Sequence, residues 1–183
     1  ELAGLMALLR SHGITREPEL LTREPDGPWY YEQLELGYNY RLTDIHAALG
    51  LSQMARLEAF VRRRNEIAAR YDEALGGLPL RPLGRQQDAY SAYHLYVVRL
   101  DLARLSRSHR DVIVALRDRG IGVNVHYMPI YRQPDYARFG VNAQDFPEAE
   151  RYYGETISLP LYVDLTEDLQ DEVVAAMREV LAP

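Results

Sequence analysis

Apolar residues recur at helical spacing in the first part of the chain, up to residue 75. In residues 1–10, Leu2, Leu5, Met6 and Leu9 fall on one side of a helix. Gly13 is a suitable residue to end it. A longer helical region, continuous or kinked, is predicted for residues 43–75, because capping residues open it and Gly76-Gly77 close it.

The segment between these helices has a different character. Residues 14–37 are rich in proline and glycine, which predicts a long irregular segment, and long loops in compact domains are usually functional or disordered. Its tip carries Trp29, Tyr30 and Tyr31, which favours the functional option.

From residue 78 onward the pattern predicts a small α+β domain in strand–helix–strand–helix order. The first strand is expected at 93–100, with His94, Tyr96 and Val98 on one face. A helix follows a capping-box signature at Ser108 and Asp111. The second strand is expected at 121–127 and the last helix from residue 166.

Composition is that of an ordinary globular protein and excludes several classes. The chain has 183 residues, is 47% hydrophobic and 26% charged, and has a net charge of -6, which argues against a nucleic-acid binder. Apolar runs are far shorter than a membrane span requires, and no signal peptide is evident. Without cysteine there is no disulfide or thiolate metal site, which is compatible with a cytoplasmic setting.

The basic residues exclude one kind of catalysis. Lys and Arg together number 21, and all of them are Arg. Chemistry that needs a lysine amine, such as Schiff-base catalysis, therefore cannot be completed by this chain alone.

The five histidines show no metal-ligand spacing, so no metal site is expected. His94 and His126 lie on the predicted strands among aromatic residues. Each is a candidate for function, with a structural histidine as the alternative. The run Arg62-Arg63-Arg64 is interpreted as a solvated helix face rather than a phosphate site, since acidic residues flank it at helical spacing.

A candidate anion site lies directly before the helix predicted to start near residue 43. Asn39 and Arg41 offer an amide and a guanidinium there, where backbone N–H groups and the helix dipole also favour an anion. The 14 tyrosines are typical both of sugar or nucleotide clefts and of subunit interfaces, and composition does not separate the two.

Taken in order, these pieces resemble the C-terminal half of nucleotide-sugar aminotransferases of the DegT/StrS type. The resemblance covers nearly the whole chain, and five ordered matches are more specific than any single one. The matching stretches are Leu9-Arg10-Ser11-His12-Gly13-Ile14, Gly37-Tyr38-Asn39-Tyr40-Arg41 with the residues that follow to Gly50, Tyr93-His94-Leu95-Tyr96, Val125-His126-Tyr127-Met128-Pro129 and Leu159-Pro160-Leu161.

The resemblance implies an α/β fold class: a fragment of the fold-type I pyridoxal-phosphate aminotransferase architecture. A helical segment of the large domain, residues 1–77, would precede a small α+β C-terminal domain, residues 78–183. The implied enzyme moves an amino group from a glutamate-type donor through pyridoxal phosphate to a keto-sugar nucleotide, in a homodimer whose active site lies at the subunit interface.

The family also implies roles for particular residues. Asn39 would reach the cofactor phosphate of the neighbouring subunit, with Arg41 assisting. His126, Tyr127 and His94 would lie on the sugar-nucleotide side. The stretch Pro28-Trp29-Tyr30-Tyr31-Glu32 looks most like the branch acting on UDP-linked 4-keto-6-deoxy-N-acetylhexosamines in pseudaminic-acid biosynthesis, which adds Trp29 and Tyr30 as substrate-binding candidates.

One departure from the family is serious. Its Schiff-base lysine lies just before the helix that here begins at Glu1, and this chain has no lysine. We therefore expect a fragment of the full enzyme that is inactive alone. The alternative is a non-catalytic dimerisation or ligand-binding module with the same fold.

Overall fold

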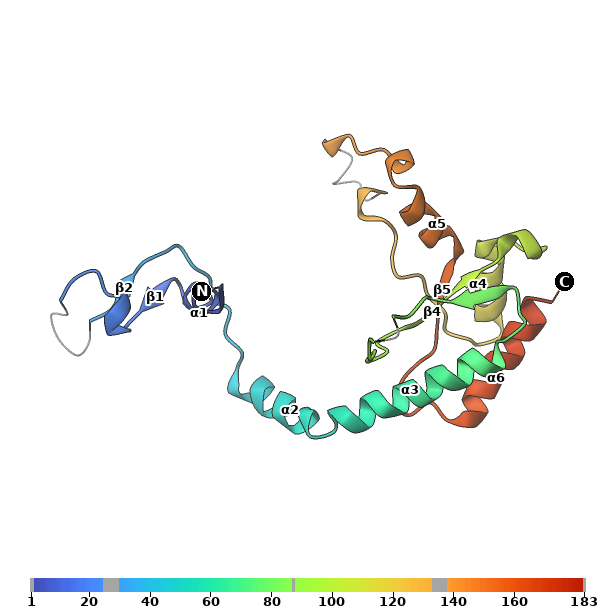
Figure 1. Ribbon diagram of the computed structural model, residues 1–183, viewed down its shortest axis with the longest axis horizontal. Coiled ribbons are helices and arrows are strands. Elements are labelled where there is room, and N and C mark those ends of the chain that lie inside the picture. Colours follow the sequence, from blue (N-terminus) through green and yellow to red (C-terminus); the bar gives the residue numbers. More distant parts are fainter. Residues whose placement is uncertain (1, 25–29, 87, 133–137, 183) are drawn as a thin grey trace. The chain divides into compact units, whose positions relative to one another are not determined.

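The computed structural model describes residues 2–24, 30–86, 88–132 and 138–182 (Figure 1). The chain divides into two compact units, Glu1–Arg56 and Leu57–Pro183. Among the described residues, no helix is long and apolar enough to span a membrane.

The first unit is built around a short antiparallel pairing. Strand β1 (Ile14–Thr15) pairs with β2 (Glu32–Gln33), and the 3-10 turn η1 (Pro18–Leu20) lies between them in sequence. Helix α1 (Leu2–Leu9) precedes them and α2 (Asp44–Met54) follows. The predicted first helix and the start of the next helix are confirmed. The segment 14–37, which was predicted to be irregular, instead contains the two paired strands β1 and β2.

Helix α2 begins where its capping residue predicts. The Thr43 side chain accepts a hydrogen bond from the His46 backbone N–H at 3.3 Å, which satisfies one of the unpaired donors of the first turn. The helical region does not continue unbroken to residue 75. It is divided at Ala55 and Arg56, and α3 (Leu57–Ala74) follows as a separate helix.

Helix α3 packs as part of the second unit. It buries Ile67, Ala68 and Tyr71 in that unit's core, and Gly77 follows it with a φ of 81° that suits glycine. Within this chain the compact C-terminal unit thus starts at Leu57. The division at residue 77 between large-domain remainder and small domain stays a prediction.

The second unit contains a three-stranded antiparallel sheet in the order β3-β4-β5. The strands are β3 (Leu80–Pro82), β4 (Tyr96–Leu100) and β5 (Thr156–Leu159). Tyr96 and Val98 of β4 are buried on one face, whereas Val97 and Arg99 point to the other. All four residues of β5 are buried, so both faces of that strand are covered.

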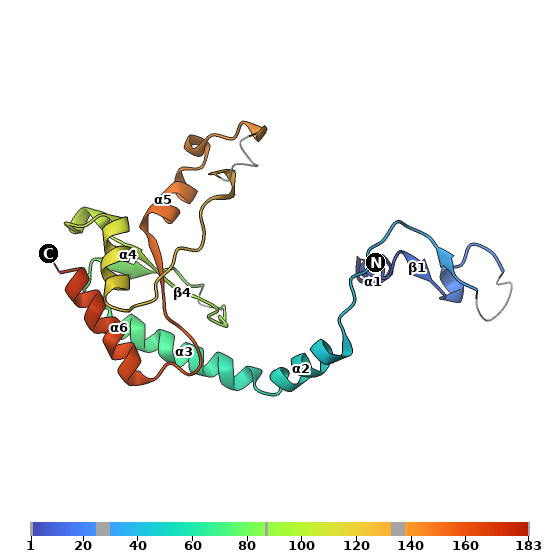
Figure 2. The ribbon, with the colours of Figure 1, turned by 180° about the vertical axis from the view of Figure 1, so that it is seen from behind.

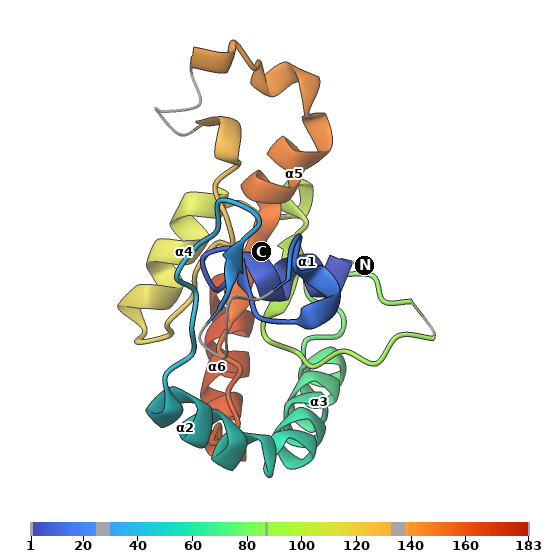
Figure 3. The same ribbon diagram turned by 90° about the vertical axis from the view of Figure 1, so that its left-hand side faces the viewer.

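Helices cover this sheet and complete the core (Figures 1 and 2). Helix α6 (Glu167–Val180) lies between α4 (His109–Asp118) and α3, as Figure 3 shows. Helix α5 (Pro147–Glu155) leads directly into β5. Further 3-10 turns are η2 (Leu102–Arg104), η3 (Ile130–Arg132) and η5 (Ala143–Asp145). The largest fully buried apolar side chains are Tyr71, Ile67, Leu116, Ile157, Leu165, Met177 and Leu181.

The strand predicted at 121–127 is wrong. Ile121 and Val123 are buried as expected, but ladder pairing is limited to a single bridge between Asn124 and Ser158. The segment packs its apolar side chains against the core without adding a strand to the sheet. The order of the second unit after α3 is therefore β3-β4-α4-α5-β5-α6, and β3, α5 and β5 were not predicted.

Candidate functional site

Asn39 and Arg41 lie on a backbone segment that is held against the end of α1. The Tyr38 N–H donates to the Leu9 carbonyl at 2.7 Å, and the Tyr40 N–H donates to the Arg10 carbonyl at 2.9 Å. Asn39 itself forms an antiparallel bridge with Ser11. The backbone that presents the two side chains is therefore fixed on both sides of Asn39.

Two glycines make this close approach possible. A Cβ at Gly37 would lie 2.3 Å from the Gly13 nitrogen and 2.6 Å from the Leu9 oxygen. A Cβ at Gly13 would lie 2.0 Å from the Glu35 oxygen, and Gly13 also has a positive φ of 68°. Because real Cβ atoms do not approach backbone so closely, these positions require glycine.

The two candidate cofactor residues contact each other. The Arg41 Nε donates to the Asn39 Oδ1 at 2.6 Å, and both side chains are exposed. Because the Asn39 oxygen accepts this bond, the Asn39 NH₂ group can donate to a ligand. The two terminal guanidinium nitrogens of Arg41 can do the same. This donor set, next to the α2 N-terminus, fits a phosphate, although Asp44 in the first turn of α2 places a carboxylate nearby.

Tyr30, in the same unit, is engaged by its own neighbours. Its hydroxyl accepts from the Arg23 Nε at 2.6 Å and donates to the Glu32 Oε1 at 2.8 Å. Partial desolvation, reinforced by the Glu32 carboxylate, raises the pKa of Tyr30, whereas the Thr22 N–H lowers the pKa of Glu32. Trp29, its predicted companion, lies outside the described residues.

His126 and Tyr127 are adjacent in the second unit. The His126 Nδ1 lies 2.8 Å from the Ser158 Oγ of β5. The Tyr127 ring meets the imidazole edge-on with 4.7 Å between centroids, and Tyr127 is 71% exposed. The pair thus presents an orientated imidazole and an open aromatic face, as in sites that bind polar ring compounds.

His94 is not on a strand, contrary to the prediction. Tyr93 has a positive φ of 46°, a left-handed conformation that an extended strand does not include. Strand β4 therefore starts only at Tyr96, and His94 lies exposed in a bend before it. The expected pairing of His94 on one strand face with Tyr96 is therefore wrong. Whether His94 contacts a substrate stays a prediction.

A network of hydrogen bonds and a cation–π contact that the sequence did not indicate involves the two tyrosines on either side of this bend, Tyr93 and Tyr96. Asp72 of α3 accepts two hydrogen bonds from Arg85, both at 2.7 Å, and one from the Tyr96 hydroxyl at 2.7 Å. The Arg85 guanidinium also lies over the Tyr93 ring, 5.1 Å from its centroid. Burial and the Asp72 hydrogen bond raise the pKa of Tyr96. No local motif connects these residues, because they come from separate elements.

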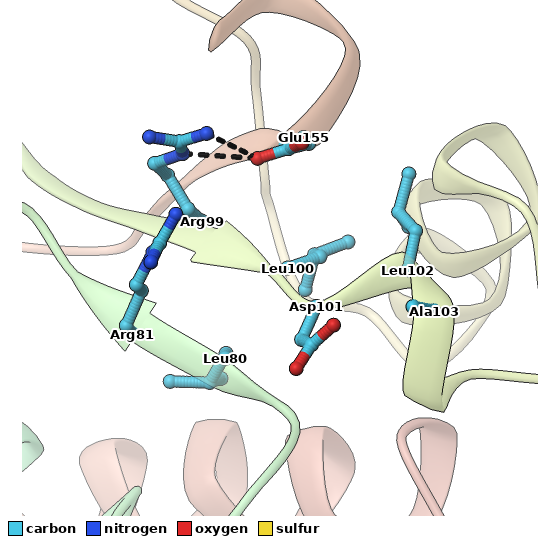
Figure 4. Close-up of a pocket in the computed structure, with 8 residues that line it drawn as sticks. All are labelled: Leu80, Arg81, Arg99, Leu100, Asp101, Leu102, Ala103 and Glu155. Carbon is cyan, nitrogen blue, oxygen red and sulfur yellow. Dashed lines mark hydrogen bonds and ion pairs between the residues drawn. The ribbon is translucent and has the colours of Figure 1, made fainter. Parts of the chain in front are cut away.

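A separate cavity of about 270 Å³ lies at the end of the sheet (Figure 4). Its charged lining includes Arg99 and Glu155, which are joined by bonds of 3.0 and 2.5 Å to a single carboxylate oxygen. Arg81 lies directly opposite Arg99 in the strand register and lines the same cavity. The residues lining it include none of the predicted site residues.

The predicted site residues therefore form two groups. Asn39 and Arg41 are brought together in the first unit, and His126 and Tyr127 in the second; Tyr30 and His94 each lie in their own surroundings. Within the described ranges, no cluster of three or more His, Asp or Glu residues could hold a metal ion.

Known proteins are similar to this chain in sequence and in fold. The chain is 37% identical over 185 residues to the spore coat polysaccharide biosynthesis protein SpsC of Bacillus subtilis, covering 99% of this chain and 47% of that protein. It is 36% identical to the uncharacterized protein MJ1066 of Methanocaldococcus jannaschii, with 47% of that protein covered. The chain thus spans about half the length of the curated relatives it matches.

Solved structures of aminotransferases are also similar to this chain. A putative sugar aminotransferase of Streptococcus pneumoniae, in its PLP form, superposes with a TM-score of 0.83 at 28% identity, covering 98% of this chain and 43% of that one. PseC of Helicobacter pylori, an aminotransferase involved in the biosynthesis of pseudoaminic acid, gives 0.82 at 28% identity, covering 98% and 46%.

These similarities confirm the expected fold class, part of the pyridoxal-phosphate aminotransferase architecture. The PLP and PMP forms of the Streptococcus protein confirm pyridoxal phosphate as a cofactor of the family. The model of the DegT/DnrJ/EryC1/StrS aminotransferase family matches residues 1–178. The chain therefore belongs to the DegT/DnrJ/EryC1/StrS aminotransferase family.

Proposed function

We propose that the protein to which this chain belongs is a pyridoxal-phosphate-dependent sugar aminotransferase. It moves an amino group from a glutamate-type donor to a keto-sugar nucleotide, as a cytoplasmic homodimer. The family match over residues 1–178 and the likeness to solved sugar aminotransferases support this proposal.

The observation that carries the proposal is the Asn39–Arg41 pair. Two glycine-dependent contacts hold its backbone, and its free amide and guanidinium donors lie next to the α2 N-terminus. We propose that this pair binds the cofactor phosphate of a neighbouring subunit. When bound, the cofactor supplies the electron sink for moving the amino group, while Asn39 and Arg41 fix its position.

The sugar nucleotide is proposed to bind at His126 and Tyr127, with His94 nearby. The exposed Tyr127 ring suits stacking on a sugar or base face, and the imidazole can hydrogen-bond a hydroxyl. Trp29 and Tyr30 are proposed as further substrate residues. The resemblance of the Pro28–Glu32 stretch suggests a UDP-linked 4-keto-6-deoxy-N-acetylhexosamine as the substrate, and the similarity to PseC, an aminotransferase of pseudoaminic acid biosynthesis, supports it.

The test uses the whole protein to which this chain is proposed to belong, supplied with glutamate, pyridoxal phosphate and the UDP-keto-sugar, and detects the amino sugar by mass spectrometry. Asn39→Ala is expected to weaken cofactor binding by about 1–3 kcal/mol, because the phosphate loses a donor. Gln53→Ala, which removes an exposed amide from α2, is the matched control and should keep the wild-type affinity. Unchanged cofactor affinity in Asn39→Ala would remove that residue from the site.

The absence of lysine from the whole sequence leaves a second candidate for this chain on its own. It would be a non-catalytic module that dimerises or binds a ligand through the same fold. A lysine in the segment preceding Glu1 in the gene would decide for the enzyme, whereas a genuine start codon near Glu1 would favour the module. In either case we propose that the 183-residue chain alone does not transaminate.

A further inference from the structure

The imidazole of His126 is held by a buried hydroxyl on the central part of β5. Ser158 is only 5% exposed, and its Oγ lies 2.8 Å from the His126 Nδ1. The Ser158 backbone is fixed as well, since its N–H donates to the Asn124 carbonyl at 2.8 Å and its carbonyl accepts from the Asn124 N–H at 3.4 Å. Both the strand and the segment carrying His126 are therefore locked around this bond.

The direction of the hydrogen bond follows from satisfying the hydroxyl. In the described part of the chain, His126 Nδ1 is the partner that the structure provides for the Ser158 hydroxyl, so an Nδ1 that accepts satisfies the hydroxyl proton, whereas an Nδ1–H that donates leaves this buried proton without a partner. The hydroxyl therefore donates to Nδ1. The proton of the neutral imidazole then resides on Nε2, which becomes a hydrogen-bond donor.

We infer that Ser158 is a positioning residue that fixes the orientation and tautomer of His126, so that Nε2–H donates to an oxygen of the bound sugar nucleotide. This inference rests on the proposed function for its ligand. The link between Ser158 and His126 is a property of this chain alone and can be tested without activity.

The same strand offers a matched control. Thr156 is 1% exposed, lies two residues before Ser158 on the same face of β5, and its Oγ1 is a buried atom for which the described residues provide no hydrogen-bond partner. Thr156→Val removes a hydroxyl from the same strand without touching His126. Ser158→Ala removes the hydroxyl that contacts it.

The first experiment measures the ring ¹⁵N shifts of His126 by NMR in the 183-residue chain. Wild type and Thr156→Val are expected to show an Nε2-protonated ring with the same Nδ1 shift, whereas Ser158→Ala moves the Nδ1 resonance toward that of a free acceptor. Ser158→Thr, which keeps a hydroxyl, should restore it. An Nδ1-protonated ring in the wild type, or an unchanged Nδ1 shift in Ser158→Ala, would overturn the inference.

The second experiment measures kinetics in the longer protein. Ser158→Ala is expected to raise KM for the UDP-keto-sugar about 10-fold, because lost uniform binding appears in KM, and Thr156→Val should change it less than about 2-fold. Equal KM values in all variants would overturn the positioning role. If the Nδ1 shift responds but the wild-type protein aminates no keto-sugar nucleotide, the proposed function fails while the Ser158–His126 link stands.

Discussion

Single residues determine the geometry of the Asn39 segment, and Gly37 is the clearest example. Alanine at this position would place its Cβ 2.3 Å from the Gly13 nitrogen. We expect Gly37→Ala to destabilise the first unit by about 1–3 kcal/mol, because backbone atoms must move to relieve the overlap. Amide hydrogen exchange at Tyr38, whose N–H donates to the Leu9 carbonyl, is the local measurement.

The control is Gly50→Ala. Gly50 lies inside α2 with open space around a Cβ, so alanine should stabilise that helix by up to about 1 kcal/mol. If Tyr38 exchanges equally slowly in Gly37→Ala and in the wild type, the close approach is not a constraint on this segment.

Asp111 gives stability a dependence on pH. The Ser108 hydroxyl donates to the Asp111 carboxylate at 2.6 Å, and this bond holds the pKa of Asp111 below its ordinary value. Because the pKa of Asp111 is lower in the folded state, its carboxylate stabilises the fold above the unfolded-state pKa of about 3.9. This stabilisation is lost as the pH falls through the folded-state pKa. The destabilisation caused by Asp111→Asn, measured as a urea midpoint, should therefore be larger at pH 7 than at pH 3. An equal loss of urea midpoint in Asp111→Asn at pH 7 and at pH 3 would contradict this prediction.

Residues with local signals could be found from the sequence, and those with distant partners could not. Asn39 and Arg41 stand together before a helix start, and the capping box spans only Ser108 to Asp111. Ser158 gave no such signal, because its partner His126 lies far away in sequence and meets it only when the sheet forms.

The helices and strands show the same distinction between local signals, which the sequence reveals, and distant partners, which it does not. Helices α1, α2, α3, α4 and α6 were predicted because periodicity and helix-ending signals are local properties. Strands β3 and β5 are short and depend on pairing with β4, so their sequences alone do not identify them. The strand expected at 121–127 had the right alternation, yet its apolar residues reach the core without a ladder.

The packing of α5 against β4 provides a prediction about an ion pair. Arg99 and Glu155 are 20% and 25% exposed, and Arg81 lies directly opposite Arg99. Removing the carboxylate with Glu155→Gln leaves two like charges facing each other, at a cost of about 1–3 kcal/mol. The free energy of unfolding from urea denaturation measures this.

A second carboxylate on α5 is the control for Glu155. Glu148 pairs with Arg151 at 3.1 Å on the exposed surface. Exposed pairs of this kind contribute little, so Glu148→Gln should change stability by at most about 0.5 kcal/mol. The double variant Arg81→Gln with Glu155→Gln should recover part of the loss, since the like-charge contact is gone. Equal effects of Glu155→Gln and Glu148→Gln would exclude a special role for the Arg99 pair.

For the whole molecule, the most consequential feature is the exposure of apolar residues on α1 and α2. None of the described residues of these two helices is buried. Ile45 is 82% exposed and Leu49 is 58% exposed. The two side chains lie one turn apart on the same face of α2. Exposed apolar patches of this kind mark association surfaces, which agrees with the proposed homodimer.

The isolated chain is therefore expected to associate at micromolar concentration, giving a light-scattering mass above the 21.0 kDa of one chain. Ile45→Gln combined with Leu49→Gln should shift the mass toward 21.0 kDa without destabilising the fold, because both side chains already face water. Val114→Gln alters a 44% exposed residue on α4 and serves as the control, which should leave the mass unchanged. A monomeric wild-type chain, or a double variant that associates as strongly as the wild type, would show that α2 does not form the association surface.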